Sequence, residues 1–592
     1  MALQLLEHSK KAGEKIYRYY SIAEPYREDG KNKKRVLAHL GSLPLEQVEK
    51  IRQALRVHND PSLQWMDPEA IECTGTWSYL ELAVFHQLWL SLKLSKIISS
   101  NEADVELEKL LEILVLNRIT DPVSKSGIVR WYPTTALESI LEVPVSSMNE
   151  SRIYRSLPPI DSQQEKIENH LFQTLIAKKD PKLQSLYFYD LTSSYFEGDG
   201  VELAARSEHS KDHRPDRLQV VLGLLINEEG LPFSWDIFKG NQGDAPTLVT
   251  QLKKFKKRFG VENALLVFDR GFLSHDNLER IEAEGYQYLT GLKAPAIKDL
   301  FLIHPQKWLS EINTETAEKT LEKESRWKRF DETGFYSELG EINHRKTVLL
   351  FDTARYKLAV LSRQKRIDAF KEWVQKHNLW LQGFKKDAAK EAIQKDVDEQ
   401  IKKKKLEAYV TYELHEFKTE NETFKRRKDN PFPSQGYMRK VSSFQIVVTE
   451  NNHDQLDGVF ALITSPKCKL TAEEMLLAYR EKYLIEHAFR EMKQALKLRP
   501  WFVYKMEHVR AHYTICVLAY LLEKILDLKL ESSGLKNEGW TLGRLKEKLS
   551  QIRFVEITVA GKNPRRSLQK IPSELSPVLK RLGLASALKI PT

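Results

Sequence analysis

The spacing of apolar residues changes several times along this chain, and each change predicts a different kind of structure. Between residues 77 and 150 apolar residues recur every three or four positions, which predicts a bundle of helices. From 184 to 295 they form short continuous runs, which are typical of buried strands. The runs are SLYFYD (185–190), LQVVLGLLI (218–226), LPFSWDIF (231–238), ALLVFD (264–269) and YQYLTGL (286–292). With helices expected at 246–259 and 275–284, these strands predict a mixed α/β layer.

The segment from 296 to 455 is richer in charged and aromatic residues, and we expect it to be a domain that interrupts the α/β layer. Polar helices, the longest at about 385–406, alternate there with strand-like runs. These runs are TVLLF (347–351), KLAVLS (357–362), EAYVTYELHEF (407–417) and FQIVVT (444–449). VFALITS (459–465) then resumes a buried strand, and TAEE (471–474) predicts a capped helix start.

The two ends of the chain have patterns of their own. Residues 15–40 are typical of two strands around a turn, with a polar helix at 44–57. An apolar helix is expected at 510–528, before a basic tail that contains KNPRRSLQK (562–570). We therefore predict a β-hairpin and helix region (1–60), a helical domain that is a candidate for DNA binding (61–180), a core in two parts (181–295 and 456–530), an insertion domain (296–455) and a basic C-terminal region (531–592).

The stretch YREKYLIEHAFREMK (479–493) carries two periodicities if it is one helix. One face would be apolar and buried: Ile485, Phe489, Met492 and Leu496. Another would be polar: Tyr479, Lys482, Glu486, Arg490 and Lys493. Such a face is usually solvated and joined by ion pairs four residues apart. The same pattern would also suit a site that needs one carboxylate delivered among cations.

Two aspartates upstream could complete such a site. Asp190 and Asp269 each end an apolar run, and acids at the edge of a buried sheet lie where sites in such sheets usually form. Strand-end acids also commonly cap turns, and other acids compete for the role: Asp212, Asp216 and Asp244. Three carboxylates brought together would bind two Mg²⁺ ions, with Mn²⁺ as a substitute. Two such ions support in-line attack on phosphorus by water or a 3′-hydroxyl.

Charge and cysteine content narrow the partners and the compartment. The 92 Lys and Arg residues exceed the 82 Asp and Glu residues, and the net charge of +10 favours nucleic acid over membrane. Three separated cysteines with no CxxC pair disfavour a disulfide framework or structural zinc. The N-terminus lacks a secretory pattern, and the apolar stretches 78–93 and 512–528 contain charges and are shorter than a bilayer span. We expect a soluble cytoplasmic protein.

Several long stretches occur in an order that resembles one family. They are DLTSSYFEG, SKDHRPDRLQVVLGLL, GLPFSWDIFKGNQGDAPT, VFDRGFLSHDNLERIEAEGYQYLTGLK and YREKYLIEHAFREMKQALKLRP. Together they resemble the DDE transposases of bacterial insertion sequences, in the branch with a Tyr-x2-Arg-x3-Glu-x6-Lys signature. The resemblance is strong over 185–295 and 440–520 and weaker over 15–45.

This resemblance implies a fold and a set of site residues. The fold would be α/β and multidomain, with an RNase H-like mixed sheet interrupted by a β-containing insertion domain, after a helical N-terminal domain. The catalytic and metal-binding triad would be Asp190, Asp269 and Glu486. DNA would be contacted by Tyr479, Lys482, Arg490 and Lys493. Lys482 stands where the signature has Arg, so it keeps the charge but loses the bidentate fork.

The resemblance also implies an activity and partners. The reaction would be cut-and-paste transposition, with metal-dependent hydrolysis, hairpin formation at the transposon ends and strand transfer. The partners would be double-stranded inverted-repeat ends, held partly by the insertion domain, target DNA and a second protomer in a homodimer, in the bacterial cytoplasm at the nucleoid. Two alternatives remain open: an RNase H-like nuclease without strand transfer, and an inactive or recruited DNA-binding protein.

Overall fold

The chain folds into two compact units. The computed structural model describes residues 2–12, 15–28, 30–60, 71–98, 105–177, 185–208, 210–303, 315–383, 387–423, 437–451, 454–559 and 563–589. One unit comprises residues 1–83, 133–140 and 546–592, and the other comprises residues 84–132 and 141–545. The predicted domain boundaries near 60 and 180 adjoin stretches that lie outside the described residues.

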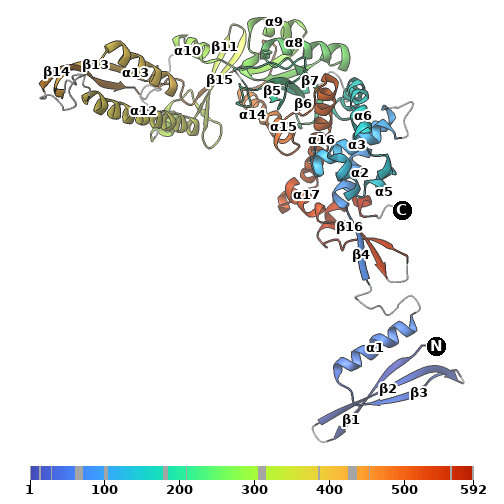
Figure 1. The fold of residues 1–592 in the computed structure, drawn as a ribbon. Helices are drawn as coiled ribbons and strands as arrows, with labels where there is room; N and C mark the ends of the chain where they lie inside the picture. Colours follow the sequence, from blue (N-terminus) through green and yellow to red (C-terminus); the bar gives the residue numbers. More distant parts are fainter. Residues whose placement is uncertain are drawn as a thin grey trace, which may run out of the picture. The chain divides into compact units, whose positions relative to one another are not determined.

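The larger unit is built on a mixed sheet, which in the described residues has nine strands in the order β10-β11-β12-β15-β9-β8-β5-β6-β7 (Figure 1). Five of its strands are β5 (Ser185–Tyr195), β6 (Gln219–Asn227), β7 (Pro232–Phe238), β8 (Ala264–Phe268) and β9 (Gln287–Gly291). The first three pair antiparallel in sequence order, whereas β8 is parallel to both β5 and β9. This arrangement is consistent with an RNase H-like core, and it confirms the predicted mixed α/β layer.

Helices cover this sheet where the apolar spacing predicts them. α8 (Asp244–Lys254), extended by a π-helical turn to Phe259, and α9 (His275–Ala283) connect β7, β8 and β9. α15 (Tyr483–Gln494) lies against β5 and β6, and α16 (Met506–Ser532) lies against β7. All residues of β6 and β8 are buried, so these central strands are covered on both faces.

The segment predicted as an insertion contributes to the sheet and also forms a separate core. β10 (Lys328–Arg329), β11 (Gly334–Ile342) and β12 (Arg345–Asp352) extend the sheet, and β15 (Val459–Thr464) joins β12 to β9. The separate core is formed by α12 (Thr353–Gln382), α13 (Lys390–Lys404), β13 (Val410–Thr423) and β14 (Tyr437–Glu450).

The strand expected at 357–362 is wrong, because this run lies inside α12. The Asp352 side chain caps that helix by accepting a hydrogen bond from the Arg355 backbone N–H. Burial then recurs at helical spacing, at Ile367, Phe370 and Val374, whereas Leu358 is exposed. α12 is therefore longer than α13, which is the helix predicted at 385–406.

The larger unit also contains a helical region. It includes α3 (Leu107–Thr120), α6 (Glu150–Ser162) and α7 (Gln164–Leu171), and α3 and α6 both pack on α16. Nearly every residue of α3 is buried, which agrees with the helical bundle predicted for 77–150. Among the described helices, none is long and apolar enough to cross a membrane.

The smaller unit corrects the expectation of a helical N-terminal domain. β1 (Gln4–Ala12), β2 (Lys15–Glu28) and β3 (Lys31–Gly41) form an antiparallel sheet before α1 (Leu45–Asn59). β2, β3 and α1 confirm the predicted hairpin and helix, whereas β1 was not predicted. β4 (Ile71–Ser78) pairs with β16 (Arg553–Val559), which also pairs with β17 (Arg565–Leu568). This sheet joins distant parts of the sequence, so local spacing does not reveal it.

Candidate active site

Two neighbouring parallel strands bring Asp190 and Asp269 to adjacent positions. β5 continues through Asp190 to Tyr195, so Asp190 does not end its strand as predicted, because pairing with β6 extends past it. β8 is shorter, and its last residue, Phe268, is paired with Tyr189. Asp190 and Asp269 each come directly after one residue of this pair. They are therefore at adjacent positions on neighbouring strands, at the carboxyl end of β8. Sites in α/β sheets form at such ends.

The stretch 479–493 is not one helix, which corrects the prediction that its polar residues share one helix face. α14 (Ala472–Arg480) ends at a turn in which the Lys482 N–H donates to the Tyr479 carbonyl, and α15 begins at Tyr483. A continuous helix would place Lys482 at the edge of the buried stripe, between Ala478 and Ile485. The turn instead makes Lys482 the residue that precedes α15.

Other predictions about this stretch are confirmed. α14 begins with the predicted cap, in which Thr471 and Glu474 exchange hydrogen bonds as a capping box. The predicted apolar face of α15 and the residues after it is buried: Ile485, Phe489, Met492 and Leu496. This face anchors Glu486 on a helix that lies against β5, the strand that carries Asp190.

The Lys482 ammonium lies among the three predicted carboxylates. Its Nζ is 2.9 Å from Glu486 Oε1 and 3.8 Å from Asp269 Oδ1. Burial opposes its charged form, but the nearby Asp190 charge, the Glu486 hydrogen bond and the Asp269 charge raise the pKa of Lys482. The Lys482 side chain is 12% exposed, whereas those of Asp269 and Glu486 are about half exposed. Lys482 therefore marks a point of concentrated negative charge.

Asp190 is the most buried of the three acids, and a second lysine approaches it. Lys211 Nζ lies 3.8 Å from Asp190 Oδ1 and donates to the Leu191 carbonyl at 2.6 Å. Burial raises the pKa of Asp190, and the charges of Lys211 and Lys482 oppose that rise. Lys211 was not predicted as a site residue, although it lies within SKDHRPDR, one of the stretches that carry the family resemblance.

The Lys493 side chain is only 10% exposed, so it does not lie on an open surface. Its ammonium donates to Thr192 Oγ1 at 2.6 Å and to Asp212 Oδ1 at 2.7 Å. Arg499 Nη1 lies 2.6 Å from the same Asp212 oxygen. Burial lowers the pKa of Lys493, with the Asp212 charge acting against it. Because Thr192 follows Asp190 closely on β5, Lys493 ties α15 to the strand that carries Asp190.

The three competing acids have other environments. Asp212 is buried between Lys493 and Arg499. Asp216 is exposed and forms a two-bond pair with Arg214, which lowers the pKa of Asp216 to about 2. Asp244 begins α8 and lines a pocket of about 350 Å³ beside β5.

The two remaining predicted DNA contacts differ in exposure. The Tyr479 ring packs on Phe460, with ring centroids 5.2 Å apart, and burial raises the pKa of Tyr479 to about 12. Arg490 is exposed on α15. Tyr479 is therefore partly covered, while Arg490 is open to a ligand.

The donor chemistry of this site suits a hard divalent cation. Carboxylate oxygens are the ligands that Mg²⁺ and Mn²⁺ prefer, and these ions keep several waters, so few protein ligands suffice. Among the described residues, no group of three His, Cys, Asp or Glu side chains is close enough to hold one ion. Glu486 and Asp269 instead contact the Lys482 ammonium, and the charge of Asp190 also acts on it, so the acids present are of the kind that bind such an ion.

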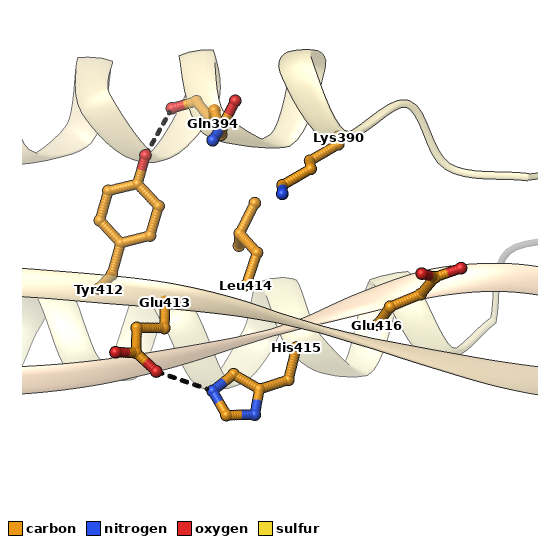
Figure 2. Close-up of a pocket in the computed structure, with 7 residues that line it drawn as sticks. All are labelled: Lys390, Gln394, Tyr412, Glu413, Leu414, His415 and Glu416. Atoms are coloured by element: carbon orange, nitrogen blue, oxygen red, sulfur yellow. Dashed lines mark hydrogen bonds and ion pairs between the residues drawn. The ribbon is translucent and has the colours of Figure 1, made fainter.

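The insertion contains an open groove between α13 and β13, far along the chain from these acids (Figure 2). The Tyr412 hydroxyl donates to Asp398 Oδ1 at 2.8 Å and lies 3.4 Å from the Gln394 carbonyl oxygen, and His415 lies 3.1 Å from Glu413. Lys390 and Glu416 also line the groove. Its charge is mixed, so this groove alone does not indicate a DNA surface.

Comparisons with known proteins place these residues in a family context. A family model for the transposase DDE domain matches residues 184–522, more than half of the chain, and one for the N-terminal domain of IS1634 family transposases matches residues 6–63. The curated proteins contain no match. Among solved structures, Marinitoga piezophila Argonaute in complex with 5′ OH guide RNA is 9% identical, with a TM-score of 0.15, over 59% of this chain and 71% of that one. So low a similarity carries no argument.

Proposed function

Because this chain belongs to the DDE transposases, and among them to the IS1634 family, we propose that Asp190, Asp269 and Glu486 form its catalytic and metal-binding triad. Family membership implies DNA transposition by a polynucleotidyl transferase that uses divalent metal ions. The observation that supports the triad is the Lys482 ammonium, which contacts Glu486 and Asp269 and is also influenced by the charge of Asp190.

Two divalent ions bound here would activate a water or a DNA 3′-hydroxyl and stabilise the departing oxygen of a phosphodiester. The chain supplies the surroundings for that chemistry. β5 and β8 carry Asp190 and Asp269 on adjacent strands, and α15, which carries Glu486, packs on β5. Lys482 offsets the mutual repulsion of the three acids before ions bind, and its charge is then available to a DNA phosphate.

The surrounding residues would position DNA and the triad. We propose that Arg490, exposed on α15, contacts DNA phosphates, and that Tyr479 lies near the cleaved end. Lys493, with two of its donors already directed to Thr192 and Asp212, keeps α15 in register with β5, and a DNA contact would use its remaining donor. Lys211 balances the buried Asp190 charge.

The finer family features are also part of the proposal. The mixed sheet is an RNase H-like core, and 479–493 is the Tyr-Arg-Glu-Lys signature with Lys482 in the Arg position. Two Mg²⁺ or Mn²⁺ ions serve each site. The substrates are double-stranded inverted-repeat ends and target DNA, bound by a homodimer in the bacterial cytoplasm at the nucleoid. Cut-and-paste transposition proceeds through hairpin ends, and the insertion helps to hold the end DNA.

A strand-transfer assay tests this function. Purified protein is incubated with Mg²⁺, end-containing DNA and a target plasmid, and the products are separated on a gel. The proposal predicts cleaved ends joined to the plasmid. Cleavage without joined product would indicate a nuclease on the same core. End binding without cleavage would indicate an inactive or recruited DNA-binding protein.

A further inference from the structure

A second pocket, of about 370 Å³, lies within the larger unit, between the end of α3 and the segment that precedes α16. One wall follows the end of α3, and another is the chain from Lys497 to Val503. The residues that line it are Arg118, Pro122, Val123, Ser124, Lys125, Ser126, Tyr154, Lys497, Arg499, Pro500, Phe502, Val503 and His512. Four of them are permanently or normally cationic, and none of these described lining residues is a carboxylate.

Two of these cations are buried. Arg118 and Lys125 are only 5% and 6% exposed. Lys125 Nζ lies 3.4 Å from His512 Nδ1. Burial and the Lys125 and Arg118 charges hold the pKa of His512 well below its usual value, so this ring is neutral and accepts the hydrogen bond.

The Arg118 guanidinium has donors to spare. Its Nη2 donates to Asn117 Oδ1 at 3.1 Å and to the Val123 carbonyl, both uncharged. Its Nε is buried and has no hydrogen-bond partner. The acid whose charge acts on Arg118 is Asp121, which is exposed and does not line the pocket.

Two buried cations facing one cavity are unfavourable without a compensating anion. Buried charges in proteins are normally paired, and an unpaired one is strongly unfavourable. Here the side chains supply only neutral acceptors, and burial lowers the pKa of Lys125 to about 7, so an anion from outside would favour the charged form of this lysine and pair with Arg118. An orphaned guanidinium N–H, an ammonium and two serine hydroxyls together suit a phosphate group, which offers several acceptor oxygens and negative charge.

We propose that this pocket binds a phosphate group, held by Arg118 and Lys125 from within and by Lys497 at the rim. Its walls also include Tyr154 and Phe502, which would cover an apolar body attached to the phosphate. The phosphate can belong to a DNA strand or to a free nucleotide. Arg499 connects this pocket to the candidate active site, because it also pairs with Asp212.

This inference goes beyond the proposed function, and its test requires neither a divalent ion nor DNA cleavage, so either can fail without the other. Inorganic phosphate is titrated into the full-length protein by calorimetry, with chloride keeping the ionic strength constant. We expect saturable binding that weakens at least tenfold in Lys125→Met and several-fold in Lys497→Ala. Lys497 is exposed, so its variant gives a result even if Lys125→Met does not fold. Exposed Lys467→Ala, outside this pocket, is the matched control.

The same titration distinguishes the sources of the phosphate. A deoxynucleoside 5′-monophosphate and a single-stranded oligonucleotide, with and without a 5′-phosphate, are compared as competitors. If the oligonucleotide competes with phosphate and Lys497→Ala weakens this competition, the phosphate belongs to a DNA strand. If only the mononucleotide competes, the phosphate belongs to a free nucleotide. Absence of saturable phosphate binding, or equal affinity in wild type and both pocket variants, would overturn the proposal.

Discussion

Replacing Lys482 with Met tests whether the Lys482 ammonium occupies the position that a divalent metal ion would take. The substitution keeps the length and much of the volume of the side chain but removes the charge that Asp190, Asp269 and Glu486 share. In buffer without divalent ions, the three carboxylates then have less positive charge nearby to offset their mutual repulsion. We expect the variant to be less stable than wild type under these conditions and to gain more stability from Mg²⁺.

The size of the effect follows from distance and exposure. Opposite charges 4 Å apart attract by about 4 kcal/mol in a partly buried setting, before solvation is considered. Removing one partner of a buried pair costs about 3–5 kcal/mol, whereas exposed pairs contribute about 0–1 kcal/mol. Lys482 is nearly buried but two of its partners are half exposed. A loss of about 1–3 kcal/mol is therefore expected without divalent ions.

Melting temperatures measured in chelator and in Mg²⁺, at equal ionic strength, provide the assay. A ligand that binds only the folded state stabilises it according to its concentration relative to Kd. Lys482→Met removes the competing ammonium, so the increase caused by Mg²⁺ should be larger than in wild type. Lys482→Arg, which retains a cation, is the matched control and should resemble wild type. If Mg²⁺ raised the melting temperature equally in wild type and Lys482→Met, the ammonium would not occupy a metal position.

Three further substitutions test the supports of the site. Asp212→Asn leaves Lys493 and Arg499 without their shared carboxylate, and urea denaturation should show a loss of about 2–4 kcal/mol; unchanged stability would contradict this role. Gly240→Ala would place a Cβ 1.9 Å from the Gln219 carbonyl oxygen. The melting temperature of this variant should therefore fall by an amount that corresponds to about 1–3 kcal/mol of stability. Gly243→Ala is the control and should be neutral, because its Cβ would meet no atom within 4 Å. Equal melting temperatures would contradict the backbone contact. Arg490→Ala should reduce the slope of log Kd for DNA against log salt by about 1, and an unchanged slope would exclude a phosphate contact.

The sequence predicts the core of the fold well because the signals there are local. Buried strands such as 264–268 appear as continuous apolar runs, and the capping box at Thr471 is visible as a short motif. The buried face that includes Ile485 and Phe489 also follows from spacing alone. By contrast, the pairing of β4 with β16 connects residues far apart in sequence, so no local pattern indicates it.

The candidate site could be predicted in composition but not in arrangement. The two aspartates were identifiable because each ends an apolar run, and the family resemblance added Glu486, yet the spacing in 479–493 did not indicate the break between α14 and α15. Spacing could not show that Lys482 would lie among the three acids, or that Lys493 would turn inward to Asp212. KLAVLS, at 357–362, contains a short continuous apolar run that is typical of a strand, but a helix cap at Asp352 and burial further along α12 override that pattern.

The central claim is that Asp190, Asp269 and Glu486 act as one metal-dependent site, and Glu486→Gln tests it most directly. The amide keeps the shape of the side chain but removes the charge of a metal ligand, and Glu486 is half exposed, so folding should be little affected. Cleavage of end-containing DNA in Mg²⁺ is measured beside end binding in the same preparation. We expect cleavage to be abolished while binding stays within a few-fold of wild type. Cleavage that persists in Glu486→Gln would contradict the assignment of the third carboxylate.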